Sequence, residues 1–332
     1  PKGEWVIDFG QEMTGWVEFS CDLPEGARAF LQFGELLQND CFYNENLRTA
    51  KAEYTFISAG KKARVRPHFT FYGFRFMKVE GIENIQLSDF DGCVIHSDIP
   101  VIGEFTTSNA KVNRLIQNAF WGQIGNFLDT PTDCPQRDER MGWTGDAHVF
   151  APTASFNMYT PAFYEKYLHD MLEQKTLGGS VPHVVPDILD QIQLGIQKQA
   201  FPTHHGSCGW GDAAIGIPWT MYEFYGDKEM LSRQYENMKL WTDWIRSQVE
   251  AHCPGRNLWL CGFHFADWLA LDNPVQGSSF GGTDPHYVAS AYYYNAAKTV
   301  SLAAQALGYA EDAAKYAILS EEIKEAFREE YF

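Results

Sequence analysis

The chain has 332 residues, more than one hydrophobic core usually serves, so we expect two domains. Its formal net charge of -17 argues against a nucleic acid or an anionic membrane as a partner and suits a neutral ligand. Aromatic residues make up 15% of the chain, which large hydrophobic cores or stacking on sugar rings would each explain.

The seven cysteines are scattered, and no two have the Cys-x-x-Cys spacing. A disulfide framework or a zinc site is therefore not expected, nor is any other cofactor, and a reducing, cytoplasmic compartment is favoured. No apolar run reaches the roughly 20 residues of a membrane-spanning helix. Because the chain begins at Pro1 without an initiator methionine, a periplasmic or secreted location stays open. The sequence also leaves the formation of a homodimer open.

The first 106 residues have the pattern of a β domain. Short runs rich in β-branched and aromatic residues are bounded by turn residues, at 5–9, 15–20, 29–34, 53–57 and 74–79. Gly10 is predicted to end the first strand, and the polar stretch 39–51 is predicted to be a long loop. Short strands with frequent turn signals are typical of an antiparallel β-sandwich.

The pattern changes near residue 107, where Ser108 or Asn109 is a suitable N-cap. Helical spacing of apolar residues follows, with a predicted helix end at Gly308. The expected helices cover 112–120, 149–158, 162–174, 212–225, 231–245, 289–303 and 316–327. Loops rich in Gly, Pro and Trp are expected at 178–187, 200–211 and 261–282. The sequence thus predicts a β domain at 1–106 and a helical domain at 107–332, with functional residues in the loops.

Residues 129–146 hold five carboxylates, two arginines, a tryptophan, two prolines and two glycines. Proline fixes φ and glycine permits positive φ, so the stretch is predicted to be an irregular loop and not a helix interior. The ordinary interpretation of a charged loop is a solvated, salt-bridged surface. The alternative is a site for a polar, ring-shaped ligand such as a sugar.

Two further loops place a carboxylate beside a tryptophan, Trp210 with Asp212 and Asp267 with Trp268. A single pair of this kind is usually a packed ring whose N–H is satisfied. Three such loops between helices indicate that the helix ends surround one pocket, for which a carbohydrate is the expected ligand.

The run 131–147, PTDCPQRDERMGWTGDA, closely resembles the signature of the bacterial α-L-rhamnosidases of glycoside hydrolase family 78. Other segments also resemble that family, at 8–17, 45–50, 69–75, 209–212 and 262–268. The resemblance implies a β-sandwich followed by an (α/α)6 barrel. It also implies hydrolysis of terminal, non-reducing α-L-rhamnose with inversion at the anomeric carbon.

The resemblance implies that Glu139 is the general acid. The substrate contacts that it implies, the last three less directly, are Asp133, Arg137, Trp143, Asp146, Trp210, Trp268 and Asp267. An inverting glycosidase needs a protonated carboxyl and a second, ionised carboxyl about 6.5–9.5 Å away. Nearby carboxylates would favour the protonated form of Glu139, and nearby arginines the ionised form.

Four neighbouring residues have simpler expected roles. Arg140 is predicted to be a structural ion-pair partner, Cys134 a packed thiol, and Asp138 a capping or paired carboxylate that faces away from the sugar. His264 is predicted either to support its loop or to contact the substrate.

One departure concerns the general base. In the family it is a glutamate on a later barrel segment, downstream of everything in this chain, and the predicted helices are fewer than a closed (α/α)6 barrel needs. We therefore expect a part of a longer enzyme that lacks this base and a C-terminal β domain; otherwise Asp212 or Asp267 would have to act as base. The alternatives are another (α/α)6 glycosidase acting on glucose-type sugars, or a non-catalytic sugar-binding fragment.

Overall fold

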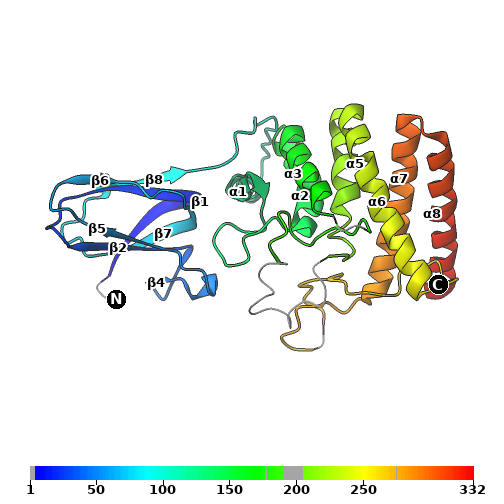
Figure 1. The fold of residues 1–332 in the computed structure, drawn as a ribbon. Helices are drawn as coiled ribbons and strands as arrows, with labels where there is room; N and C mark the ends of the chain where they lie inside the picture. The colour runs from blue at the N-terminus through cyan, green and yellow to red at the C-terminus, as the bar shows by residue number, and fades with distance from the viewer. Residues whose placement is uncertain (1–3, 176–177, 190–204, 274) are drawn as a thin grey trace. The chain divides into compact units, whose positions relative to one another are not determined.

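A computed structural model describes residues 4–175, 178–189, 205–273 and 275–332 (Figure 1). Its contacts define two compact units. We call the first the sheet unit, which holds Pro1–Asp98 and Glu104–Met141, and the second the hairpin unit, which holds Ile99–Gly103 and Gly142–Phe332.

The sheet unit is mainly antiparallel β-structure. Its six-stranded sheet is formed by β1 (Trp5–Cys21), β2 (Arg28–Gly34), β5 (Glu53–Ile57), β6 (Ala63–Val65), β7 (Tyr72–Glu80) and β8 (Phe90–Val94). They are hydrogen-bonded in the order β5-β2-β7-β1-β6, and β8 also pairs with β1. The first part of β1 pairs with β7 and its second part with β8 and β6, so this strand belongs to both layers of the sandwich in Figure 1.

The core of the sheet unit lies between these layers and is made of alternate residues of the strands. Fully buried examples are Val17, Phe19, Leu31, Phe33 and Phe74. Each strand turns successive side chains to opposite faces, so the alternating pattern in the sequence places these apolar residues on one face. The predicted β-sandwich is confirmed.

Two local predictions for this unit are wrong. Gly10 does not end the first strand, because β1 continues to Cys21 with a register shift between Asp8 and Met13. Gly10 has φ +78, and a glycine with positive φ permits a bulge as readily as a strand end. The predicted loop at 39–51 contains ordered elements instead: the strand β4 (Cys41–Tyr43), which pairs with β3 (Leu36–Gln38), and the 3-10 turn η1 (Glu45–Leu47).

The remaining elements of the sheet unit are η2 (Leu87–Asp89), α1 (Ala110–Asn126), β9 (Phe127–Leu128) and β10 (Thr130–Pro131). The side chain of Asn109 accepts hydrogen bonds from the backbone N–H groups of Lys111 and Val112, so Asn109 is the N-cap of α1, one of the two predicted. The Thr14 hydroxyl of β1 donates to the Gly125 carbonyl of α1 at 2.7 Å. This buried bond fixes α1 to the sheet.

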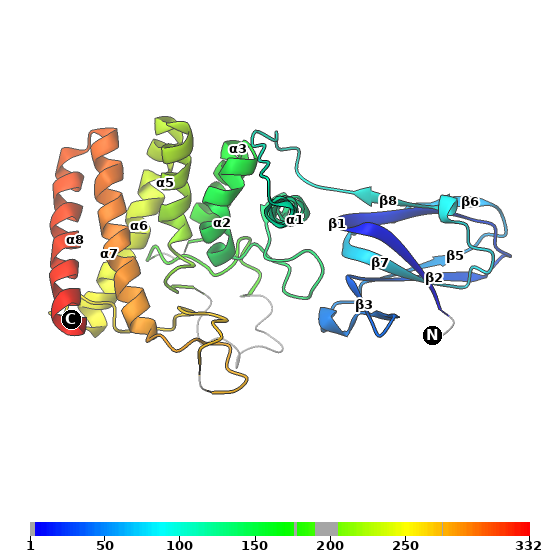
Figure 2. The same cartoon turned by 180° about the vertical axis from the view of Figure 1, so that it is seen from behind.

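The described helices of the hairpin unit follow one another in twos across short turns (Figures 1 and 2). They are α2 (Thr144–Asn157) and α3 (Pro161–Glu173), α5 (Ala213–Tyr225) and α6 (Lys228–His252), and α7 (Pro285–Leu307) and α8 (Ala310–Tyr331). Helix α5 packs against α6 and α7 against α8, while α2 packs against α5. Gly226 and Gly308 cap α5 and α7 with left-handed φ values of 66° and 83°. The predicted helices are confirmed in position. Of the predicted loop at 200–211, residues 200–204 lie outside the described residues.

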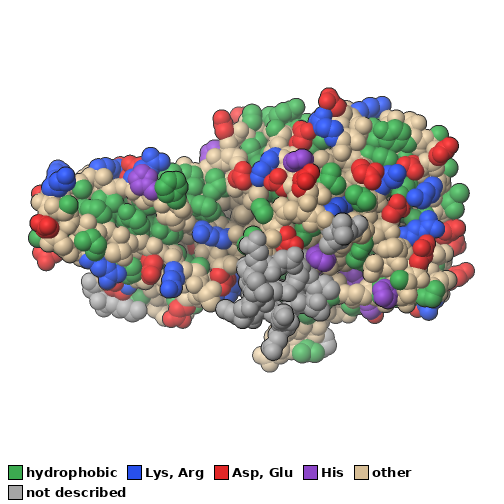
Figure 3. All heavy atoms as spheres, viewed as in Figure 1, with side chains coloured by type: hydrophobic (Ala, Val, Ile, Leu, Met, Phe, Trp, Pro, Cys, Tyr) green, Lys and Arg blue, Asp and Glu red, His purple; other side chains and the backbone are tan. Residues whose placement is uncertain are grey.

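Charged side chains of both signs are mixed over the visible face of the hairpin unit (Figure 3). Within the described parts of the chain, no helix combines the length and the apolar character that a bilayer crossing requires.

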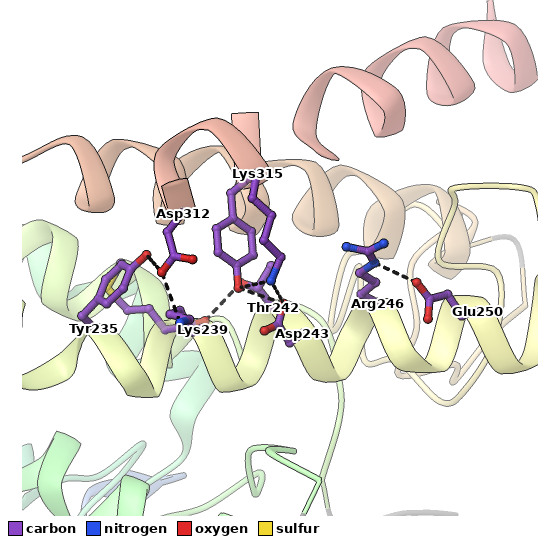
Figure 4. A network of polar contacts seen from close by, with 10 residues as sticks. Tyr235, Lys239, Thr242, Asp243, Arg246, Glu250, Asp312 and Lys315 are labelled. Carbon is purple, nitrogen blue, oxygen red and sulfur yellow. Dashed lines mark hydrogen bonds and ion pairs between the residues drawn. The ribbon is translucent and has the colours of Figure 1, made fainter. Parts of the chain in front are cut away.

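A polar network joins α6 to α8 (Figure 4). The Tyr235 hydroxyl donates to Asp312 at 2.9 Å, and the Lys239 ammonium lies 3.1 Å from the same carboxylate. One turn further along α6, Asp243 accepts from the Tyr316 hydroxyl at 2.8 Å. Burial alone would raise the pKa of Asp312, but the hydrogen bonds from Tyr235 and Lys239 hold it below its ordinary value.

We expect Asp312→Ala to lower the free energy of unfolding by about 1–2 kcal/mol at neutral pH, because it removes the acceptor for Tyr235 and Lys239. The folded pKa of Asp312 is lowered, so this contribution is present above the ordinary pKa and is lost as the pH falls through the folded one. The difference between variant and wild type, measured by urea unfolding, should therefore shrink in acid.

Glu311→Ala is the matched control, because it removes an exposed carboxylate from the same first turn of α8. It should change the free energy of unfolding by less than about 0.5 kcal/mol. Equal losses in the two variants would show that the effect comes from charge at the helix terminus and not from the network.

Candidate functional site

The stretch 129–146 is irregular only in its middle. Thr130–Pro131 forms the short strand β10 against β9, and Thr144 begins α2. The prediction of a loop is therefore right for 132–143 and wrong at both ends. The stretch also passes from the sheet unit to the hairpin unit after Met141, so each unit carries its own group of candidate residues.

In the sheet unit, arginines surround Glu139. Arg48 contacts Glu139 Oε2 through its Nη2, and Arg137 Nη2 lies 3.6 Å from Glu139 Oε1. Arg137 Nη2 also lies 3.9 Å from Asp133 Oδ2. The structure therefore brings together the predicted residues Asp133, Arg137 and Glu139. The Glu139 side chain is 34% exposed and that of Asp133 only 7%, so the contacts at Glu139 are partly screened by solvent.

Asp138 is paired, as predicted. It accepts hydrogen bonds from the backbone N–H and the hydroxyl of Thr49, and its Oδ1 lies 2.7 Å from Arg48 Nη2. Burial alone would raise the pKa of Asp138, but the hydrogen bonds from Thr49 and the charge of Arg48 lower it below its ordinary value. One arginine thus contacts both Asp138 and Glu139.

The predictions for Arg140 and Cys134 have different outcomes. Among the described residues Arg140 contacts Phe71: its Nη1 donates to the Phe71 carbonyl at 3.1 Å, and its guanidinium lies 4.7 Å from the ring centroid. Its role is structural, as predicted, while no ion pair of Arg140 is found among the described residues. Cys134 is packed as predicted, and burial raises the pKa of its thiol to about 12.

A cavity of about 340 Å³ opens beside this group within the sheet unit. Its polar lining includes Lys51, Tyr72, Gln136, Arg137 and Arg140. The volume falls at the lower end of the range of about 300–1,000 Å³ that small-molecule pockets have. Arg137 therefore lines this cavity and also contacts Glu139.

In the hairpin unit, the three predicted tryptophans surround one phenylalanine. The ring centroid of Phe265 lies 4.4 Å from Trp210, 5.4 Å from Trp268 and 6.2 Å from Trp143. Phe265 is buried, whereas the three tryptophans are half-buried. This arrangement leaves part of each indole accessible for packing against a ligand.

Gly145 is required for this cluster. A Cβ at Gly145 would lie 2.6 Å from the Trp210 ring, too close for any side chain. The glycine therefore lets Trp210 lie against the first turn of α2, which also carries the exposed carboxylate of Asp146. An acidic residue in this position interacts favourably with the positive end of the helix dipole.

Asp212 and Asp267 differ in accessibility. Asp212 is 1% exposed and accepts hydrogen bonds from the Gly209 N–H at 2.7 Å and from Trp241 Nε1 at 3.2 Å. Burial raises the pKa of Asp212 to about 7, against the effect of these two bonds. Asp267 is half-buried and accepts from the Thr283 hydroxyl at 2.8 Å. Asp212 therefore has a structural role, while Asp267 is accessible.

His264 supports its loop, one of the two predicted roles. Its Nδ1 accepts from the Cys208 N–H at 3.1 Å, and its Nε2 lies 3.0 Å from the Cys261 carbonyl. Burial lowers the pKa of His264 to about 4, so the ring is neutral near pH 7 and Nε2 donates to Cys261. These bonds tie the segment that carries Trp268 to the segment that carries Trp210.

Sequence reasoning gave no role to two residues at these sites, Arg48 and Phe265. Both lie inside segments that resemble the rhamnosidase family, at 45–50 and 262–268. That resemblance was the available signal, but it did not indicate which residue each side chain contacts.

A β-sandwich followed by helical hairpins is the architecture that two matching family models describe. Residues 100–332 match the model for the bacterial alpha-L-rhamnosidase 6 hairpin glycosidase domain, and residues 1–96 match the bacterial alpha-L-rhamnosidase concanavalin-like domain. The chain belongs to the bacterial α-L-rhamnosidase family.

Individual relatives agree with this assignment. The alpha-L-rhamnosidase of Alteromonas sp. (strain LOR) is 34% identical over 337 residues, which cover 100% of this chain and 35% of that protein. The crystal structure of the Streptomyces avermitilis alpha-L-rhamnosidase complexed with L-rhamnose has a TM-score of 0.87 at 33% identity, over 100% of this chain and 30% of that one. The enzyme from Dictyoglumus thermophilum has a TM-score of 0.89 at 31% identity, over 100% and 36%. The chain thus spans about a third of the length of these relatives.

Proposed function

We propose that this chain carries the general acid, Glu139, of an inverting α-L-rhamnosidase that removes terminal, non-reducing α-L-rhamnose from rhamnosides. The observation that supports the proposal best is the grouping of Asp133, Arg137 and Glu139 within the family signature. Membership of the rhamnosidase family supports the choice of sugar.

In this proposal Glu139 protonates the glycosidic oxygen as the bond to the leaving group breaks. Asp133 and Arg137 hydrogen-bond the sugar hydroxyls, because charged partners make the stronger hydrogen bonds. Trp143, Trp210 and Trp268 offer indole surface to the apolar face of the sugar, including the methyl group of a deoxy sugar. Asp146 and Asp267 are accessible carboxylates that can accept hydrogen bonds from further hydroxyls.

Inversion requires a second, ionised carboxyl that activates water, about 6.5–9.5 Å from the acid. Asp212 is unsuited to that role, because it is buried and both of its oxygens accept hydrogen bonds. We therefore propose that the base is not Asp212; it is either Asp267, which is accessible, or a residue outside these 332. The tests below accordingly use the natural protein that contains this chain.

We expect the natural protein to hydrolyse α-L-rhamnosides and not α-D-glucosides.

Glu139→Gln removes the transferable proton, so kcat on a rhamnoside with an unactivated sugar leaving group should fall by about 10²–10⁴-fold. The loss should be much smaller on 4-nitrophenyl α-L-rhamnoside, because nitrophenolate leaves without protonation. Initial rates on the two substrates measure this difference.

Glu18→Gln is the matched control, since Glu18 is a partly buried glutamate of the same unit that is paired with Arg64 and Arg66. It should keep full activity on both substrates. Turnover of the unactivated rhamnoside by Glu139→Gln at the wild-type rate would eliminate Glu139 as the acid.

Inversion predicts β-L-rhamnose as the first product, before mutarotation mixes the two anomers. Proton NMR of the reaction during the first turnovers distinguishes the anomeric signals. Initial release of the α-anomer would instead indicate a retaining mechanism with a covalent intermediate.

A further inference from the structure

Arg48 approaches the proposed acid from a segment that is distant in the sequence. It is 91 positions away from Glu139, yet its Nη2 contacts Glu139 Oε2 and lies 2.7 Å from Asp138 Oδ1. Asp138 is held in turn by the backbone N–H and the hydroxyl of Thr49. A continuous chain of contacts therefore runs from Thr49 through Asp138 and Arg48 to Glu139.

The local sequence fixes the backbone at Arg48. The preceding turn η1 ends at Leu47, which is 1% exposed and belongs to the sheet core. The Arg48 N–H donates to the Glu45 carbonyl at 3.1 Å, and the Ala50 N–H donates to the Leu47 carbonyl at 3.2 Å. The Asn46 amide donates to Glu35 at 2.7 Å on the other side of the turn. Arg48 therefore extends from an anchored point and not from a free loop.

The backbone of Arg48 is itself unusual. Its φ of +59° with ψ of -114° lies where residues with a Cβ are seldom found. Such a conformation is kept only when the surrounding contacts impose it, and it is concentrated at functional sites. Glycine would adopt this backbone without strain but has no guanidinium group. The contribution of this position is therefore the side chain of Arg48.

We propose that Arg48 is a positioning residue for Glu139: it holds the carboxyl group of the acid in the orientation that proton transfer to the leaving group needs. The inference rests on the proposed function and extends it, because it assigns a role to a residue outside the signature at 131–147. Arg48 does not touch the reacting atoms in this proposal. It acts through Glu139.

The experiment compares Arg48→Ala and Arg48→Lys with wild type in the natural protein. We expect Arg48→Ala to lower kcat by about 10–100-fold on an unactivated rhamnoside, because misplacing a catalytic group by about 1 Å can cost 10²-fold. On 4-nitrophenyl α-L-rhamnoside, which needs little acid assistance, the loss should stay below about 3-fold. The rate on the unactivated rhamnoside should return toward wild type in Arg48→Lys, which keeps a positively charged donor at this position.

Arg64→Ala is the matched control, because Arg64 is also a half-exposed arginine of the sheet unit that contacts two carboxylates, Glu18 and Asp91. It should leave both rates unchanged. Equal losses of Arg48→Ala on the two substrates, or an Arg48→Lys variant no faster than Arg48→Ala on the unactivated rhamnoside, would overturn the positioning role. If Arg48→Ala does not fold, Arg48→Gln, which keeps much of the side-chain length without the charge, takes its place, and the losses on the two substrates decide in the same way. A wild-type protein inactive on both rhamnosides would refute the proposed function itself, and this inference with it.

Discussion

The arrangement of the candidate acid depends on ion pairing within the sheet unit. Arg48 and Arg137 each contact one oxygen of Glu139, and each contacts a second carboxylate as well, Asp138 or Asp133. Partly exposed ion pairs contribute little to stability one at a time, so their value here is geometric. They fix the direction of a carboxyl group that lies in an irregular, proline-containing segment, where regular secondary structure supplies no such constraint.

The hairpin unit contributes a different feature, a cluster of large aromatic rings. Phe265 is the common neighbour of Trp143, Trp210 and Trp268, and Gly145 gives Trp210 the room to approach α2. The hydrogen bonds of His264 hold the loop that carries Phe265. Such a rigid aromatic surface suits the apolar face of a sugar, because little side-chain entropy remains to be lost on binding.

Prediction from sequence succeeded where a local pattern has one structural solution. Buried residues at helical spacing, such as Trp241 and Ile245, indicate an amphipathic helix, and the predicted helices lie where the structure has them. Gly10 was misassigned because a glycine with positive φ can end a strand or bulge it. Arg48 was missed because its contact with Glu139 spans 91 positions, and no local pattern encodes such a distance. The resemblance of the signature supplied roles for its residues, but only coordinates reveal what orients them.

We propose that Glu139 is the carboxyl group that protonates the glycosidic oxygen of a rhamnoside. A crystal structure of the natural protein with L-rhamnose tests it most directly. We expect a Glu139 oxygen to lie within about 3.2 Å of the anomeric oxygen of bound α-L-rhamnose, which takes the place of the glycosidic oxygen, while Arg48 still contacts the other oxygen of that carboxylate. A bound α-anomer with a different carboxyl group at its anomeric oxygen, and Glu139 out of reach, would contradict this assignment.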